Sequence, residues 1–324
     1  MDLRYRRNIL SKISFLFPGQ GAQYVGMGRE IYENYQIARE VFEEASRALG
    51  YSISDLCFNS DEETLSKTEN TQVAMLTVST AILKVIESYG IKPYAAAGLS
   101  LGEYGAIVTA GCIPFKEAVK LIKKRGRYMQ QAVPEGVGSM AALLGLPEEE
   151  LEEVLKKGRK FGIVEGSNFN CKGQIVIGGE IKALNEAAEA AKEKGAKAVL
   201  LKVSAPFHTS MLKEASDKFY EELKNTEIKK PEIKLCINLT GEYLKEDQDI
   251  KKVLRDGIKS PVYFMKEIET MTADGVDTFI ELGPSKILSS FVKKTNRQVM
   301  VLNVEDAASL NNTLEKLKGG NSSC

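Results

Sequence analysis

One pentapeptide of the sequence has the residue types of an activated serine. It reads Gly-Leu-Ser-Leu-Gly over Gly98 to Gly102, with Ser100 at its centre, between a predicted strand and a predicted helix. A nucleophile elbow needs that context, because the serine sits on a tight, strained turn where side chains two residues away would collide. The same turn directs the backbone N–H of Leu101 towards a helix N-terminus, where it can stabilise an oxyanion. We therefore predict Ser100 as a nucleophile; the alternative is an ordinary strand-to-helix turn whose glycines serve packing alone.

A serine nucleophile needs a base, and the sequence offers one imidazole. His208 is the only histidine of the chain, and imidazole is the usual partner of a catalytic serine. It lies in residues 205–210, a predicted loop between elements, where catalytic residues are often found. A surface or helix-capping histidine is the alternative. The group that orients the imidazole stays open between a backbone carbonyl, which needs only to accept from Nδ1–H, and three acids: Asp277, Glu281 and Asp306.

One arginine lies on the apolar side of a predicted helix. Phe115, Ala118 and Ile122 follow helical spacing in the segment 115–131, and Arg125 falls on the same stripe. A buried guanidinium must be paired, and its planar fork suits a carboxylate held through two parallel hydrogen bonds. The partner is either an acid of the protein or a substrate. In the second case the substrate carries a free carboxylate as well as a reactive acyl group.

A polar loop follows the first predicted strand. Residues 17–23 read Phe-Pro-Gly-Gln-Gly-Ala-Gln. They make a poor nucleotide-phosphate loop, because Tyr24 stands where the dinucleotide pattern requires glycine and no Gly-Lys-Ser/Thr follows. In an active site, Gln20 would donate to an oxyanion through its side chain or its backbone N–H. A tight turn with exposed amides is the third interpretation.

The segments that would position these residues alternate between strands and helices. Apolar runs bounded by glycine or proline predict the strands, and helical periodicity predicts the helices. The expected strands are 13–17, 94–99, 233–238 and 278–282, and the expected helices are 29–49, 72–89, one opening at 102–104, 115–131, 210–223, one through Met265 and Met271, and a final helix followed by a strand. Such alternation is typical of an α/β protein.

A different order of elements interrupts this pattern. Strands are expected over 138–144, 161–166, 174–177 and 198–203, with helices over 147–157 and 181–194. The resulting β-α-β-β-α-β order is that of a ferredoxin-like unit. We therefore predict a small domain of residues 135–204 inserted into a large, discontinuous domain of residues 1–134 and 205–318, with a disordered tail over 319–324.

Composition limits the classes of function. Acidic and basic residues balance at 44 each, so no overall field favours nucleic acid or a membrane surface. Five scattered cysteines and a lone histidine predict reduced thiols in a cytoplasmic protein and no metal site. The basic N-terminal segment is not followed by an apolar region, so no signal peptide is expected. We also see no apolar run long enough for a membrane span.

Taken together, the motifs resemble the malonyl-CoA:acyl carrier protein transacylase family over nearly the whole chain. Several independent motifs in the family's order are far more specific than the serine pentapeptide alone. They are Phe17-Pro18-Gly19-Gln20-Gly21-Ala22-Gln23, Thr71-Gln72, Gly98-Leu99-Ser100-Leu101-Gly102-Glu103-Tyr104, Arg125-Gly126, Asn168-Phe169-Asn170, Gly173-Gln174, Phe207-His208 and Glu281-Leu282-Gly283-Pro284. The resemblance implies an α/β-hydrolase-like core with the ferredoxin-like insert.

The resemblance also implies a mechanism. Ser100, activated by His208, would take malonyl from coenzyme A as an ester and pass it to the phosphopantetheine thiol of holo acyl carrier protein. Arg125 would hold the malonyl carboxylate, and the backbone N–H groups of Gln20 and Leu101 would form the oxyanion hole. No cofactor is expected, since the coenzyme A thioester is a substrate. Three further pocket residues are implied: Gln72, Asn168 and Phe207, the last similar to malonyl-selective members because its ring leaves little room for an α-methyl group.

The chain departs from the family at two positions. Leu99 stands where histidine often precedes the nucleophile, which changes the polarity of the pocket but not the base. Gly257 stands where glutamine is common, at a position whose backbone carbonyl orients the catalytic histidine. A carbonyl role survives a change of side chain, although glycine makes the loop less rigid.

Other functions remain as alternatives. A serine thioesterase would use the same Ser-His pair, but a hydrolase of neutral esters has no use for a buried cation. A nucleotide-binding protein would leave Ser100 and His208 unexplained, and a silent docking domain would not need the intact set. We expect a monomer that serves fatty acid biosynthesis, with a polyketide pathway as the alternative.

Overall fold

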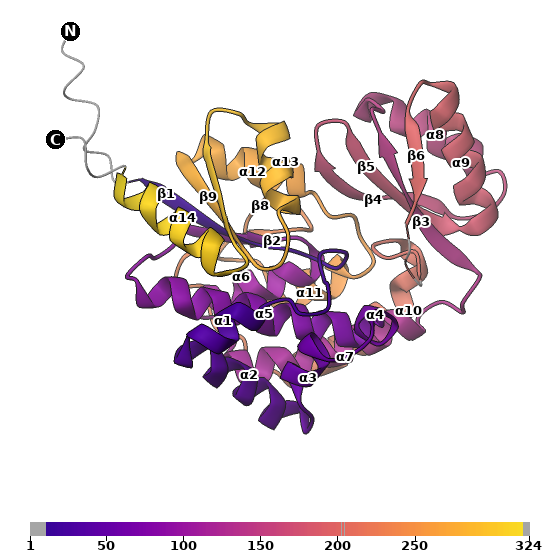
Figure 1. Ribbon diagram of the computed structural model, residues 1–324. Coiled ribbons are helices and arrows are strands. Elements are labelled where there is room, and N and C mark those ends of the chain that lie inside the picture. The colour runs from indigo at the N-terminus through magenta and orange to yellow at the C-terminus, as the bar shows by residue number, and fades with distance from the viewer. Residues whose placement is uncertain (1–10, 202, 204, 320–324) are drawn as a thin grey trace, which may run out of the picture.

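The computed structural model describes residues 11–201, 203 and 205–319 of the chain (Figure 1). Its larger sheet has the strand order β10-β9-β1-β2-β7-β8, in which all neighbours are parallel except β7 and β8. The strands are β1 (Lys12–Phe17), β2 (Ala95–Gly98), β7 (Lys234–Ile237), β8 (Glu242–Tyr243), β9 (Val276–Leu282) and β10 (Met300–Val304). Parallel strands end at one edge of a sheet, so the loops after β1, β2 and β7 lie close together.

Helices cover both faces of this sheet, as Figure 1 shows. Consecutive residues of the central strand β1, from Phe15 to Phe17, are therefore fully buried, as a strand between two helical layers requires. Helix α5 is buried on all sides from Thr71 to Leu83, which confirms the buried helix predicted there. The helices of this part are α1 (Arg29–Asn34), α2 (Gln36–Leu49), α3 (Ile53–Phe58), α4 (Glu62–Ser66), α5 (Thr68–Ser88), α6 (Glu103–Thr109), α7 (Phe115–Gln131), α10 (Lys213–Lys224), α11 (Ile250–Gly257), α12 (Phe264–Ala273), α13 (Ile287–Thr295) and α14 (Ala307–Gly319).

A second, antiparallel sheet lies beside the first and has the order β4-β5-β3-β6. Its six elements follow the predicted β-α-β-β-α-β order, so the ferredoxin-like unit is confirmed. They are β3 (Gly138–Leu144), α8 (Leu151–Gly158), β4 (Val164–Cys171), β5 (Gln174–Glu180), α9 (Ile181–Glu193) and β6 (Lys197–Leu200). The unit has a hydrophobic core of its own, formed by one sheet face, the buried side of α8 and the alanine-rich side of α9. The domain limits at 134/135 and 204/205 stay a prediction.

Strand β4 connects the second sheet to the larger part of the chain through the loop between α11 and α12. The Asn168 region pairs with Val262 in a parallel bridge, and the Phe169 N–H donates to the Val262 carbonyl over 2.8 Å. The Phe169 and Tyr263 rings stack with their centroids 5.0 Å apart. Polar side chains of β4 are thereby held facing the loops after β1 and β2.

Several predicted elements differ from the observed ones. The helix expected over 29–49 is interrupted at Tyr35, which takes an extended conformation (φ −126°, ψ 117°) without any glycine or proline to mark the break. The strand expected over 161–166 begins later, because the turn at 159–163 precedes β4. Helices α3, α4, α11 and α14 and strand β8 had no prediction of their own. Gly319 ends α14, so the tail begins at least one residue later than expected; residues 320–324 and Lys202 of the strand expected over 198–203 lie outside the described residues.

Candidate active site

The serine pentapeptide forms the predicted elbow. Strand β2 ends at Gly98, Ser100 takes a left-handed conformation (φ 56°), and α6 begins at Glu103. A Cβ on Gly98 would lie 2.1 Å from the carbonyl oxygen of Gly102, and a Cβ on Gly102 would lie 2.0 Å from that of Phe17. Real Cβ atoms do not approach oxygen that closely, so Gly98 is required by the turn itself and Gly102 by the close approach of β1.

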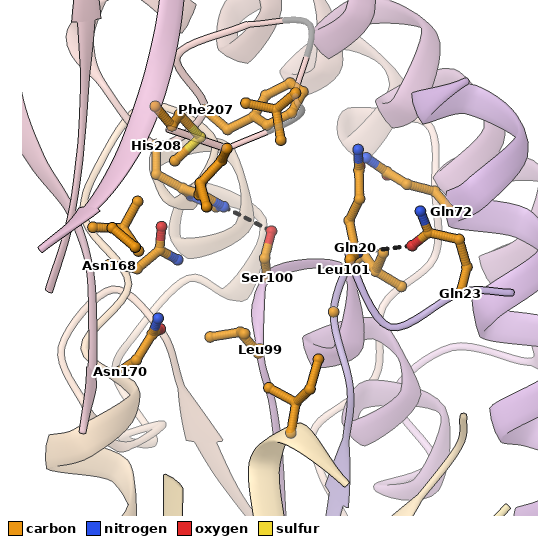
Figure 2. A pocket seen from close by; sticks show the side chains of 18 of the residues that line it. Gln20, Gln23, Gln72, Leu99, Ser100, Leu101, Asn168, Asn170, Phe207 and His208 are labelled. Atoms are coloured by element: carbon orange, nitrogen blue, oxygen red, sulfur yellow. Dashed lines mark hydrogen bonds between the residues drawn. The ribbon is translucent and has the colours of Figure 1, made fainter. Parts of the chain in front are cut away.

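His208 lies against Ser100, as the sequence predicted. The Ser100 Oγ and His208 Nε2 atoms are 2.7 Å apart (Figure 2), and His208 Nδ1 is 2.8 Å from the carbonyl oxygen of Gly257. A carbonyl only accepts, so Nδ1 carries the proton and Nε2 is free to accept from the serine hydroxyl. Among the orienting groups left open, the structure selects the carbonyl. The three acids have other partners: Asp277 with Ser11, Glu281 with the N–H groups of Leu288 and Ser289, and Asp306 with Ser309.

The imidazole is buried and electrically neutral. Burial, with the nearby Arg125 charge as a smaller cause, lowers the pKa of His208 from 6.5 to about 4. At neutral pH the ring is thus unprotonated and ready to accept a proton from Ser100. The cation of Arg125 lowers the pKa further because two positive charges in one buried site repel each other.

If His208 is the base for acylation of Ser100, its low pKa predicts an unusual acid limb for that step. The base is active above its pKa, so kcat/KM should stay near its plateau between about pH 5 and 6.5, where an ordinary imidazole loses most of its unprotonated form. Single-turnover acylation measured across this range tests the prediction. Enzyme returned from pH 5 to pH 7 must regain full activity, which excludes acid unfolding. An inflection near pH 6.5 would contradict it.

Arg125 is buried beside Ser100, and none of the described carboxylates pairs with it. Its Nη1 donates to Gln72 Oε1 over 3.0 Å, and its Nη2 donates to Ser100 Oγ over 3.2 Å. Only 3 % of the residue is exposed, yet among the described residues no carboxylate lies within 4.0 Å of the guanidinium. Glu103 acts on it from a greater distance, and burial raises the pKa of Glu103 to about 7. The described part of the chain therefore supplies no full counter-charge for Arg125.

A cavity of about 500 Å³ opens over Ser100 between the two sheets. Every predicted site residue lines it except Arg125, which is hydrogen-bonded to two of the lining residues, Ser100 and Gln72. The predicted residues that line it are Gln20, Gln72, Ser100, Leu101, Asn168, Phe207 and His208. Leu99 and, from α13, Ile287 and Phe291 add an apolar wall. The four described cysteines are all buried free thiols, and the described residues hold no cluster of three His, Cys, Asp or Glu side chains that could bind a metal.

Sequence reasoning missed several residues that hold the site. Asn238 accepts a hydrogen bond from the Ser100 N–H over 2.6 Å, and Ser167 Oγ donates to the Phe207 carbonyl beside the base over 2.7 Å. Asn238 stood at the end of a predicted strand, which was the one available signal. Ser167 fell beyond the predicted limit of its strand. No helix within the described part of the chain is long and apolar enough to cross a membrane.

Comparisons with known proteins agree on one family. The model of the acyl transferase domain matches residues 14–320. A malonyl CoA-acyl carrier protein transacylase of Bacillus subtilis is 45 % identical over 314 residues, which cover 96 % of this chain and 99 % of the relative. The crystal structure of a malonyl CoA-acyl carrier protein transacylase from Clostridium perfringens superposes with a TM-score of 0.94 at 50 % identity, covering 95 % of this chain and 98 % of that one. A malonyl-transacylase solved in complex with its type II PKS acyl carrier protein is also similar, with a TM-score of 0.91 at 37 % identity. The match covers 94 % of this chain and 100 % of that one.

Proposed function

This chain belongs to the acyl transferase domain family, among the malonyl CoA-acyl carrier protein transacylases, and we propose that it moves malonyl from malonyl-CoA to the phosphopantetheine thiol of holo acyl carrier protein. Ser100 is the nucleophile and His208 the base of this proposal. The similarity to malonyl CoA-acyl carrier protein transacylases supports malonyl transfer as the reaction. The geometry of the cavity supports the roles given to Ser100 and His208.

One observation carries the proposal beyond a general serine hydrolase. Arg125 is a buried cation 3.2 Å from the nucleophile oxygen, and no described acid within 4.0 Å neutralises it. Leaving a charge buried and unpaired is costly. A substrate with a carboxylate next to its reactive acyl group, such as malonyl, would supply the missing partner at that place. A thioesterase for neutral acyl chains would have no reason to maintain it.

In the first half of the proposed reaction, Ser100 attacks the thioester. His208 Nε2 takes the proton from Oγ while Oγ bonds to the carbonyl carbon. The backbone N–H groups of Gln20 and Leu101 stabilise the negative oxygen of the tetrahedral intermediate. The carbon–sulfur bond then breaks, the proton passes from His208 to the coenzyme A sulfur, and the malonyl-serine ester remains. The malonyl carboxylate replaces Ser100 Oγ as acceptor for Arg125, because the ester oxygen is a weaker acceptor than a carboxylate.

The second half reverses these steps with a new thiol. His208 takes the proton of the phosphopantetheine thiol, and the sulfur attacks the ester carbon. The carbon–oxygen bond breaks, and the proton returns from His208 to Ser100 Oγ. Asn168 and Gln72 would contact the bound malonyl group from the cavity wall. No cofactor takes part in this proposal.

Phe207 is proposed to exclude substituted malonyl groups. Its ring lines the cavity beside His208 and is 7 % exposed. Phe207→Ala should raise kcat/KM for methylmalonyl-CoA relative to malonyl-CoA by about 10- to 100-fold, the range that one methyl group in a pocket commands. Competition between the two substrates, read by mass spectrometry, measures the ratio. An unchanged ratio in a variant that retains malonyl transfer would contradict this role.

The wider setting is also proposed. We place the reaction in the cytoplasm, in a monomer, and in fatty acid biosynthesis, as the family resemblance implies. The similar complex with a type II PKS acyl carrier protein makes a polyketide carrier the alternative. Comparing transfer rates to the two kinds of holo carrier from the same source distinguishes these pathways.

The decisive experiment follows the acyl group. Protein mixed with malonyl-CoA alone should gain one malonyl group in intact-mass analysis. Added holo carrier should then remove the adduct and become malonylated itself, whereas the apo carrier, which lacks the thiol, should not. Free malonate formed at the rate of adduct loss would instead establish a thioesterase. A protein that gains no adduct and turns over no substrate would refute the catalytic proposal.

A further inference from the structure

A buried amide under the nucleophile elbow has no role in the reaction described above. Asn238 follows β7 directly and is 2 % exposed. Its Oδ1 accepts from the Ser100 N–H over 2.6 Å, and its Nδ2 donates to the Gly98 carbonyl over 2.7 Å. One carboxamide thus holds the backbone on both sides of Leu99. These two residues are Gly98, the last residue of β2, and Ser100, the central residue of the elbow.

The sheet explains why an amide is found there. Strands β2 and β7 are parallel neighbours, with Ala95 opposite Lys234 and Ala96 opposite Leu235. Continuing this register brings Asn238 to the level at which β2 turns away into the elbow. The backbone of β7 does not pair with β2 beyond the point where β2 turns away. There the Asn238 side chain supplies one acceptor and one donor to the β2 segment, as a peptide group would.

The conformation held by this amide is a strained one. Ser100 has φ 56°, which lies in the left-handed backbone region that residues other than glycine and asparagine seldom adopt. Such a residue keeps its conformation only where the surrounding structure holds it. The hydrogen bond from the Ser100 N–H to Asn238 acts on the strained residue itself. It also commits that N–H to the protein interior, so the amide next in the chain, that of Leu101, is the one available at the elbow for an oxyanion.

Asn238 is held in turn by two buried carboxyls. Its backbone N–H donates to Glu103 Oε1 over 2.8 Å, and its Nδ2 donates to Glu267 Oε1 over 2.8 Å. Burial raises the pKa of Glu103 to about 7 and that of Glu267 well above its usual value. Glu103 is the first residue of α6, so the same contacts connect the elbow, the helix after it and α12.

We propose that Asn238 is a positioning residue for acyl transfer, which holds Ser100 Oγ and the Leu101 N–H in register with the reacting carbonyl. This inference rests on the proposed function. It goes beyond that function by assigning the rate of acylation to a residue that touches no substrate.

The first test is Asn238→Ala. Single-turnover formation of the malonyl-enzyme should slow by about 100-fold at saturating malonyl-CoA, because a displacement of about 1 Å at a reacting group costs that much. The malonyl-CoA concentration at half-saturation should change little, since the cavity and Arg125 remain. Asn225→Ala, at the exposed end of α10, is the matched control. Rates are divided by the folded fraction from thermal melting, so that lost stability is not counted as lost positioning.

The second test is Asn238→Asp, which keeps the shape of the side chain. Its carboxyl can accept from the Ser100 N–H in either form but can donate to the Gly98 carbonyl only when protonated. Glu103, Glu267, the Cys236 thiol and, farther off, the Arg125 cation face this position. Acylation by this variant should therefore fall by at least about tenfold as pH rises from 5 to 8, while Asn225→Asp keeps the wild-type profile.

The outcomes separate positioning from mere support of the fold. Normal acylation by folded Asn238→Ala would overturn the proposal, and so would a flat pH profile of Asn238→Asp. If the alanine variant does not fold, the aspartate variant decides alone. Adduct formation by the wild-type protein in the same series reports on the proposed function, so a failure of that function is seen there and not in the variants.

Discussion

Replacing Ser100 with alanine is expected to lower kcat for malonyl transfer by about 10⁴- to 10⁶-fold and to abolish the covalent adduct. Among the described residues that line the cavity, Ser100 supplies the nucleophilic atom in contact with the imidazole, with Oγ 2.7 Å from His208 Nε2. Without it, water or the incoming thiol must attack malonyl-CoA directly, helped only by the oxyanion donors. Intact-mass analysis with malonyl-CoA and a coupled carrier assay measure both effects.

The control for this prediction is a serine elsewhere on the surface. Ser290→Ala changes an exposed residue of α13 and should keep both the adduct and the rate. The Ser100→Ala protein should still bind malonyl-CoA, since Arg125 and the cavity remain. An adduct that persists in Ser100→Ala would move the nucleophile to another residue and end the proposed mechanism.

The second large effect concerns selectivity for a carboxylate. Arg125→Ala should lower kcat/KM for malonyl-CoA by about 10²- to 10³-fold, which is the usual result of removing one member of a buried, charge-assisted pair. Acetyl-CoA has no carboxylate to pair, so its kcat/KM should fall much less or rise. The ratio of the two constants is the quantity to measure. Arg125→Lys should recover part of the malonyl rate, because an ammonium keeps the charge but not the two parallel donors.

Arg127 offers a matched control on the same helix. It is two residues from Arg125 but exposed, with its guanidinium 5.5 Å from the ring centroid of Tyr128. Arg127→Ala should leave the malonyl-to-acetyl ratio unchanged. If Arg125→Ala lowered kcat/KM equally for malonyl-CoA and acetyl-CoA, the role of Arg125 would be to support Ser100 and not to recognise a carboxylate.

Local steric requirements made much of the site readable in the sequence. The elbow could be predicted because Gly98 faces a contact of 2.1 Å within the turn that leaves no room for a side chain, whereas the 2.0 Å contact of Gly102 is with Phe17 of β1 and was found only in the structure. His208 could be predicted because the sequence contains no other histidine. Arg125 could be predicted because helix periodicity alone places it on the buried side of α7. Each inference needed only neighbours in the chain or the spacing of one helix.

Contacts between distant segments decided the rest. The carbonyl that orients His208 belongs to Gly257, 49 residues away; the family resemblance pointed to this position, but the residues alone did not separate it from the three acids considered. Whether Arg125 pairs with an acid of the protein depends on where every buried carboxyl lies in the folded chain. Only the tertiary structure shows these positions. The break at Tyr35 has no glycine or proline to mark it, so the sequence did not predict it.

The sequence by itself determined which residues are candidates for the chemistry and the order of most elements, because backbone sterics and hydrophobic periodicity act over a few residues. Only the tertiary structure decided what holds those residues in place. Asn238 reaches the Ser100 N–H across 138 positions of the chain because β7 pairs with β2. Strand pairing joins segments without regard to their distance in sequence, so such a contact exists only once the sheet has formed.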